Sequence, residues 1–165
     1  MRALLPGAWV VAAVAGLALG ASAARALPAP MSAEDLEKNS DVVATVRVLA
    51  VVCTGQVPYG KTTEQTTTYQ AWLQVVSVKK GDVKENQTLL VAWQDVPKKL
   101  IGPWKVEYLP GEEVPTYLKW NAEQKAYHTT WWNAKGKPTK PATADKLPEK
   151  DGQVIIAKDL GEAPK

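Results

Sequence analysis

The stretch "DVVATVRVLAVVC", residues 41–53, decides the fold class of this chain. Its residues are mostly β-branched, and apolar side chains recur at every second position, which is the period of a half-buried β-strand. One face of such a strand carries only apolar side chains, those of Val42, Ala44, Val46, Val48, Ala50 and Val52. The other face includes Thr45 and Arg47. We therefore expect one face in a core and the other partly in water, as in an antiparallel sheet or a small barrel.

Further strand patterns follow along the chain. The stretch "TTTYQAWLQVVSV", residues 66–78, predicts a second long strand, with Tyr69, Ala71, Leu73 and Val75 on one face. The stretch "TLLVAW", residues 88–93, predicts a third. The stretches "VPTYLKW" and "KAYHTTWW" predict a hairpin across "NAEQ", residues 121–124. The shorter stretches "WKVEYL" and "GQVIIAKDL" each favour one more short strand.

A short helix precedes the strands. In "MSAEDLEKNSD", residues 31–41, Ser32 stands at a helix start and Asp35 follows at capping-box spacing. Leu36 is the main apolar anchor, and Asn39 and Ser40 end the helix. We found no helical crossover between the strands, which parallel pairing requires. The predicted fold is all-β: a five- or six-stranded antiparallel Greek-key, OB-like barrel preceded by one short helix.

The N-terminus has the layout of a cleavable secretory signal. Arg2 precedes an uncharged apolar stretch at residues 8–19, and two A-x-A sites follow at residues 21–26. An uncleaved membrane anchor is the alternative, but the apolar stretch is short for a span of ~20 residues. We expect cleavage after Ala26, a secreted or periplasmic location, and no stable membrane anchor afterwards.

The chain thus divides into three parts: a signal peptide at 1–26, a β-barrel domain at 27–133 and a tail at 134–165. The tail is rich in Lys, Pro, Ala and Thr as far as Lys150, and this composition predicts that it is largely disordered. The whole chain has a formal net charge of +3, and two arginines leave with the signal. The small net charge of the chain that remains predicts no nucleic-acid partner.

The sequence offers few groups for metal or catalytic chemistry. Cys53 is the only cysteine and His128 the only histidine, and they fall on different expected strands. A zinc site uses about four ligands, so we expect no metal and no cofactor. Cys53 ends an apolar run, which favours a buried, inert thiol over a reactive or intermolecular one.

No nucleophile motif of the G-x-S-x-G type is present, so the chain is predicted not to be an enzyme. A hydrolase remains an alternative, because Asp95, Glu107, Glu112 and Glu113 could supply paired carboxylates. A charged turn explains Glu112 and Glu113 equally well.

Four stretches together resemble a known group of domains: "LEKNSDVVATVRV", "VVSVKKGD", "TLLVAW" and "LPGEEVPTYLKW". The group comprises exported bacterial β-barrel domains with an OB-like fold, akin to netrin/TIMP-like modules. The residues that carry the resemblance are Ser40, Asp41, Val42, Val43, Val75, Val78, Lys80, Gly81, Pro110, Gly111, Glu112, Tyr117 and Leu118. TIMP-like inhibitors act through an N-terminal cysteine held by disulfides, and this chain has neither. The resemblance implies a fold and an exported bacterial protein, without a catalytic residue.

Tryptophan is the unusual residue of this chain. It has seven tryptophans and no phenylalanine, and all but Trp9 follow the predicted cleavage site. These side chains either fill the core in place of phenylalanine or stack on sugar rings at a surface. As a strand, "YHTTWW" places Tyr127 and Trp131 on one face, which we assign to the interior.

The opposite face of that strand then carries His128 and Trp132 near solvent, beside Trp120 across the hairpin. Trp132, His128 and Trp120 are therefore the candidate binding residues. The predicted function is an exported non-enzymatic binding or interaction module, whose partner is an unidentified protein or polysaccharide. A carbohydrate-binding surface built on exposed tryptophans is the alternative.

Overall fold

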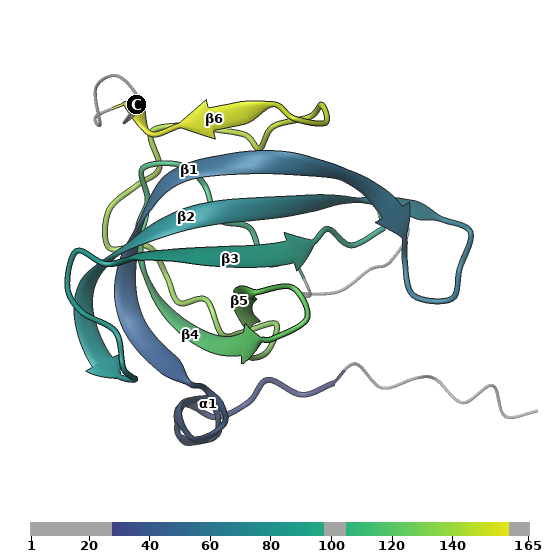
Figure 1. Cartoon of the computed structure of the whole chain (residues 1–165). Helices are drawn as coiled ribbons and strands as arrows, with labels where there is room; N and C mark the ends of the chain where they lie inside the picture. The colour runs from purple at the N-terminus through teal and green to yellow at the C-terminus, as the bar shows by residue number, and fades with distance from the viewer. Residues whose placement is uncertain (1–27, 98–104, 159–165) are drawn as a thin grey trace, which may run out of the picture.

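The computed structural model describes residues 28–97 and 105–158 (Figure 1). The elements run in the order α1 (Ala33–Asn39), β1 (Val42–Pro58), β2 (Gln65–Lys80), β3 (Thr88–Gln94), β4 (Glu113–Asn121), β5 (Ala126–Thr129) and β6 (Val154–Ile156). The predicted β-rich class, with one short helix ahead of the strands, is confirmed. The helix in this part of the chain is too short to cross a membrane.

Five strands close into a ring and the sixth lies outside it. Around the ring β1 pairs with β2, β2 with β3, β3 with β5, β5 with β4, and β4 with β1. Strand β6 pairs with residues 50–52 of β1, beyond the part of β1 that pairs with β4. The sheet is mixed, because β3 and β5 pair in parallel at Val91 and Tyr127. The prediction of a purely antiparallel sheet is wrong in this respect. The chain between β3 and β5 contains β4 and is long enough to serve as a parallel crossover.

Strand β1 changes its buried face halfway along. Val46 and Val48 are buried as predicted, but beyond them Val51 and Cys53 are buried. The pairing of β1 with β2 shifts register between Val48 and Ala50. A β-bulge of this kind inserts one residue and moves the apolar set to the other face. The alternation in β2 runs through without such a flip, and Leu73 and Val75 lie in the core as expected.

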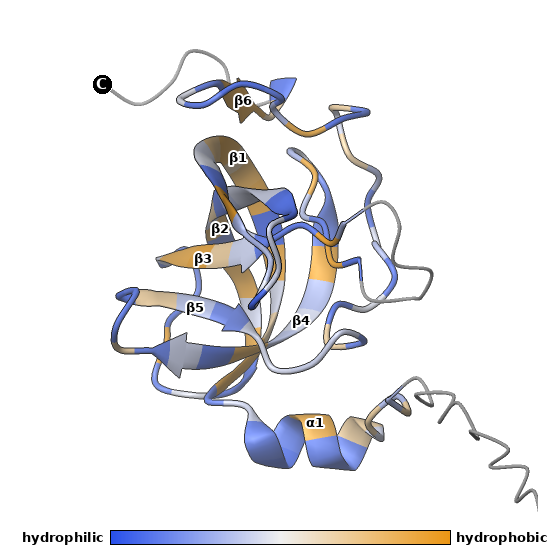
Figure 2. Cartoon of the chain, turned by 90° about the vertical axis from the view of Figure 1, so that its right-hand side faces the viewer, coloured by the Kyte–Doolittle hydropathy of each residue, from blue (hydrophilic) through white to orange (hydrophobic). Residues whose placement is uncertain are grey.

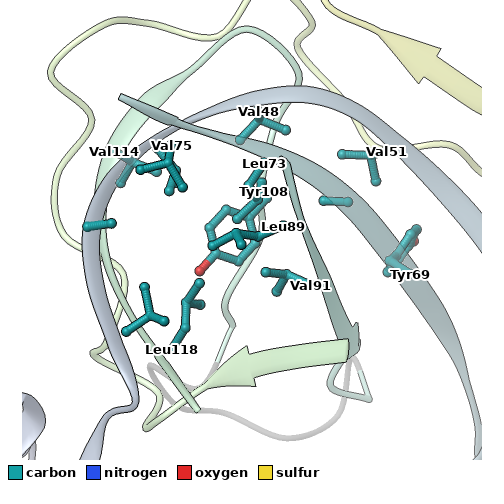
Figure 3. Packing of buried hydrophobic residues seen from close by; sticks show 14 of the residues in the cluster. Val48, Val51, Tyr69, Leu73, Val75, Leu89, Val91, Tyr108, Val114 and Leu118 are labelled. Carbon is teal, nitrogen blue, oxygen red and sulfur yellow. The ribbon is translucent and has the colours of Figure 1, made fainter. Parts of the chain in front are cut away.

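The core fills the inside of the ring (Figure 3). Its largest fully buried side chain is Tyr108, whose hydroxyl lies 2.6 Å from that of Thr116. Burial raises the pKa of the Tyr108 phenol, so the hydroxyl stays protonated. The stretch "WKVEYL" was predicted as a strand, yet residues 105–109 form none. It contributes to the core through one side chain instead of through sheet pairing.

Helix α1 is capped as the sequence predicts. The Ser32 hydroxyl accepts a hydrogen bond from the Asp35 amide at 3.0 Å, and Leu36 is buried. At the other end the Lys80 ammonium donates to the carbonyls of Glu37 and Ser40, both at 2.6 Å. Glu37 lies in the last turn of the helix and Ser40 is its C-cap residue, and carbonyls at this end have no intrahelical partner. Figure 2 shows α1 as mostly hydrophilic, with a short hydrophobic band.

The predicted disorder of the tail is wrong for residues 134–158. Ala134 is fully buried and its carbonyl accepts from the Tyr117 amide at 3.0 Å. Leu147 packs against the core, and β6 pairs with β1 as the stretch "GQVIIAKDL" favoured. The composition predicted disorder because the segment has few apolar side chains, but main-chain hydrogen bonds and ion pairs hold it in place. The predicted signal peptide and residues 159–165 lie outside the described residues.

Candidate functional site

The stretch that holds both adjacent tryptophans is a bulge beside β4. Leu118 of β4 pairs with Thr129 of β5, and two residues earlier Thr116 pairs with Lys135. Two steps along β4 therefore correspond to six steps along the partner segment, so four residues are extruded. We call residues 130–133 the bulge. Strand alternation ends at Thr129, before either tryptophan.

The predicted interior position of Trp131 is therefore wrong. Trp131 and Trp132 are both half-buried, and neither belongs to the core cluster. Tyr127, which precedes the bulge, does pack against the core as expected. The period-two argument holds for the four residues of β5 and fails where the extra residues leave the sheet.

The bulge contacts a segment far away in sequence, residues 28–31, which we call the strap. The Trp131 indole N–H donates to the Ala29 carbonyl at 3.1 Å. The neighbouring Trp132 indole N–H donates to the Pro28 carbonyl at 3.3 Å. Both tryptophans thus present their polar edges to consecutive carbonyls of one extended piece of chain.

Asn133 completes this contact with its side-chain amide. Its Nδ2 donates to the Met31 carbonyl at 2.9 Å, and its Oδ1 accepts from the Met31 amide at 3.2 Å. The Asn133 side chain thus makes the two main-chain hydrogen bonds that a residue of a neighbouring strand would make with Met31. All four hydrogen bonds between the bulge and the strap go to main-chain atoms of the strap.

Next to this contact is an open hollow of about 370 Å³, which we call the bulge-side hollow. Its walls come from the strap, the bulge, β3 and β5, and include Pro28, Trp93, Val106, His128, Trp131 and Trp132. Two of the predicted binding residues, His128 and Trp132, therefore share one site.

A second hollow of about 570 Å³, which we call the arm-side hollow, is lined by the C-terminal half of β1 and the N-terminal half of β2. Its lining includes Thr54, Val57 and Gln70. Both hollows are lined by Ala92, Trp93, Gln94 and His128. The two hollows therefore meet at a shared wall formed by the end of β3 and by β5.

Trp93 is the central side chain of that wall, and sequence patterns did not single it out. Its ring stacks on Tyr69 with centroids 5.3 Å apart and meets Tyr108 edge-on at 5.6 Å. Its indole nitrogen is buried and has no hydrogen-bond partner among the described residues. An unpaired buried donor costs about 1 to 3 kcal/mol. The stacked Tyr69 ring and the edge-on Tyr108 ring fix the orientation of the Trp93 ring.

His128 is one of two polar side chains of the shared wall, beside Gln94. Partial burial lowers the pKa of its imidazole, and the nearby Lys119 lowers it further. The ring is therefore neutral at neutral pH. Its Nδ1 lies 3.1 Å from the Thr129 carbonyl, a hydrogen bond when this nitrogen carries the proton. In that tautomer Nε2 is an acceptor.

Trp120, the third predicted binding residue, lies elsewhere. It pairs with Tyr127, and the two rings meet edge-on with centroids 5.0 Å apart. His128 pairs instead with Lys119, the neighbour of Trp120, so Trp120 and His128 project from opposite faces of the hairpin. The expected grouping of Trp120 with His128 and Trp132 is wrong. Trp120 is nevertheless 47% exposed.

Three of the four carboxylates considered for hydrolysis have lysine partners, and the fourth, Asp95, accepts a hydrogen bond from the Val96 amide at 2.8 Å. Ion pairs join Glu112 to Lys135 at 2.6 Å, Glu113 to Lys140 at 2.5 Å and Glu107 to Lys105 at 2.6 Å. Cys53 is buried in the core, as expected. Within residues 28–97 and 105–158, no group of three or more His, Cys, Asp or Glu side chains is placed to hold a metal ion.

These features define a β-rich ring with an aromatic, weakly polar concavity at one end. Comparison with protein-family models, with curated proteins and with solved structures finds no match to the chain.

Proposed function

We propose that this protein is an exported, non-catalytic binding module that holds its ligand in the two adjacent hollows. One observation carries the proposal: the hollows meet at a wall formed by Trp93 and His128, and the bulge-side hollow is edged by Trp131 and Trp132. Aromatic side chains with a few polar groups are the usual lining of a binding site. The His128 imidazole and the Gln94 side chain, which line both hollows, supply those polar contacts.

Two features of the sequence support the export and the scaffold. The N-terminal layout is that of a secretory signal, and the chain resembles OB-like netrin/TIMP-like modules. A ring of five strands is the framework of such modules, which bind extended ligands on one side of the ring. The partner class that follows is a protein segment or a polysaccharide.

A carbohydrate ligand is the second candidate, and the half-buried indoles of Trp131 and Trp132 favour it. Flat aromatic faces at the rim of an open hollow can stack on sugar rings. A hydrolase remains the third candidate. It would use Asp95, a glutamate freed from its lysine, or an activated His128.

A ligand panel tests the proposal. Proline-containing peptides and soluble oligosaccharides are titrated into the protein, with intrinsic tryptophan fluorescence as the readout. Trp132→Ala should weaken binding of the active ligand by at least about tenfold, because it removes part of the hollow's rim. Trp120→Ala is the matched control and should leave binding unchanged, since Trp120 lies on the other face of the hairpin.

The same variants separate the rival functions. A loss of binding with Trp120→Ala alone would place the site elsewhere. Turnover of a hydrolase substrate that disappears in His128→Gln would replace the binding proposal with an enzymatic one.

A further inference from the structure

We propose that the bulge is a docking surface for an extended, proline-containing peptide, and that the strap occupies this surface in cis and competes with the partner. This inference rests on the proposed binding function and names the class of ligand. The bulge is residues 130–133, and the strap is residues 28–31.

The first argument is the direction of the hydrogen bonds. Trp131 and Trp132 donate to two consecutive carbonyls of the strap, and Asn133 both donates and accepts at the next non-proline residue, Met31. Every bond goes to the main chain, so the surface recognises an extended backbone and not a particular strap side chain. A peptide from another protein can offer the same acceptors and the same amide.

The second argument is the proline content of the strap, Pro28-Ala29-Pro30-Met31. Proline has no main-chain N–H, and its ring restricts φ to values that suit an extended helix of the polyproline II type. Donors on tryptophan side chains that meet carbonyls of a proline-rich segment are a recurring mode of peptide recognition. The strap therefore has the sequence features that we expect of the ligand.

The third argument is that the contact is open on one side. Pro28, Ala29 and Pro30 are exposed, so the strap lies on the surface and can be displaced without unfolding the core. Pro28 also lines the bulge-side hollow. A longer peptide seated on the bulge therefore runs directly into the hollow beside Trp93 and His128.

Competition from the strap lowers the apparent affinity of the bulge for a free peptide. A tethered segment acts at an effective concentration of about a millimolar, so a free peptide competes poorly while the strap is intact. Weakening the strap should reveal the affinity of the surface. The two prolines can be replaced without touching the bulge, because none of the four hydrogen bonds uses a proline side chain.

The experiment uses the full chain with Pro28→Gly and Pro30→Gly combined, which makes the strap flexible. A synthetic heptapeptide, Leu-Pro-Ala-Pro-Met-Ser-Ala, copies residues 27–33. The loosened variant should bind this peptide at least about tenfold more tightly than the wild-type chain. A control peptide with alanine in place of both prolines should bind more weakly. Adding Trp132→Ala to the loosened variant should abolish the gain, whereas adding Trp120→Ala should not.

Met31→Pro loosens the strap by a second route, since it removes the amide that donates to Asn133, and it replaces the glycine variant if that variant does not fold. Peptide binding that is absent from a folded, loosened variant overturns the proposal. If the loosened variant instead binds an oligosaccharide of the panel, the peptide inference fails and the binding function stands. If no ligand of either class binds any of the variants, both proposals fail.

Discussion

Replacing Lys135 by methionine tests whether the segment after the bulge is an integral part of the fold. Lys135 pairs with Glu112 at 2.6 Å, and the Glu112 side chain is 3% exposed. The substitution removes the charge but keeps much of the apolar stem. It leaves the Glu112 carboxylate buried with one remaining contact, the Leu109 amide at 2.8 Å.

The expected cost is large because the remaining charge has no counterion. Breaking a buried pair from one side costs about 3 to 5 kcal/mol, and the retained hydrogen bond from Leu109 argues for the lower end, about 3 kcal/mol. Lys140→Met is the matched control. Lys140 pairs with Glu113 at 2.5 Å, and the two side chains are 68% and 13% exposed, so water screens this pair more and its loss should cost less, about 1 kcal/mol.

Urea and thermal unfolding measure both variants. A loss of 3 kcal/mol should lower the Tm of Lys135→Met by roughly 10 °C. The double variant with Glu112→Gln should recover part of the loss, because a neutral amide oxygen still accepts from Leu109 and no buried charge remains. If Lys135→Met and Lys140→Met destabilise the protein equally, the buried Glu112–Lys135 pair does not fix the segment after the bulge to the fold.

Three further outcomes are expected. Gly111→Ala should destabilise the fold by about 1 to 3 kcal/mol, because Gly111 has a φ of 89° and an added Cβ would lie 2.7 Å from the Thr143 amide nitrogen. A variant as stable as the wild type would contradict this close contact. The pKa of His128 is lowered in the folded state, so the free energy of unfolding should fall as pH drops through about 6.5 toward the folded pKa. His128→Gln should flatten this part of the pH profile of stability. Equal pH profiles for the wild type and the variant would contradict the lowered pKa. Mass spectrometry of the exported protein should find an N-terminus near Leu27, and recovery of intact Met1 in a membrane fraction would refute cleavage.

Residues in continuous strands could be predicted from the sequence. The alternation in β2 placed Leu73 and Val75 inside correctly, and the Ser32 cap located the start of α1. These predictions succeeded because each depends on neighbours within a few residues. The buried face of β1 beyond Val48 could not be predicted, because the register shift there depends on how two strands pair.

The candidate site was predicted only in part, for the same reason. His128 and Trp132 line one hollow, but the four extruded residues broke the alternation that placed Trp131 inside. Trp93 was missed because its position at the shared wall follows from the closure of the ring. The tail was misjudged because composition reports apolar content and not main-chain hydrogen bonds.

The most direct test of the binding site follows the indole N–H resonances of the ¹⁵N-labelled protein during titration with the active ligand. Assignment uses the single tryptophan variants. The resonances of Trp93, Trp131 and Trp132 should shift with one common affinity, because all three line the bulge-side hollow. Those of Trp72 and Trp120, which are exposed away from that hollow, should stay in place. Shifts confined to Trp72 or Trp120 would contradict the proposed site.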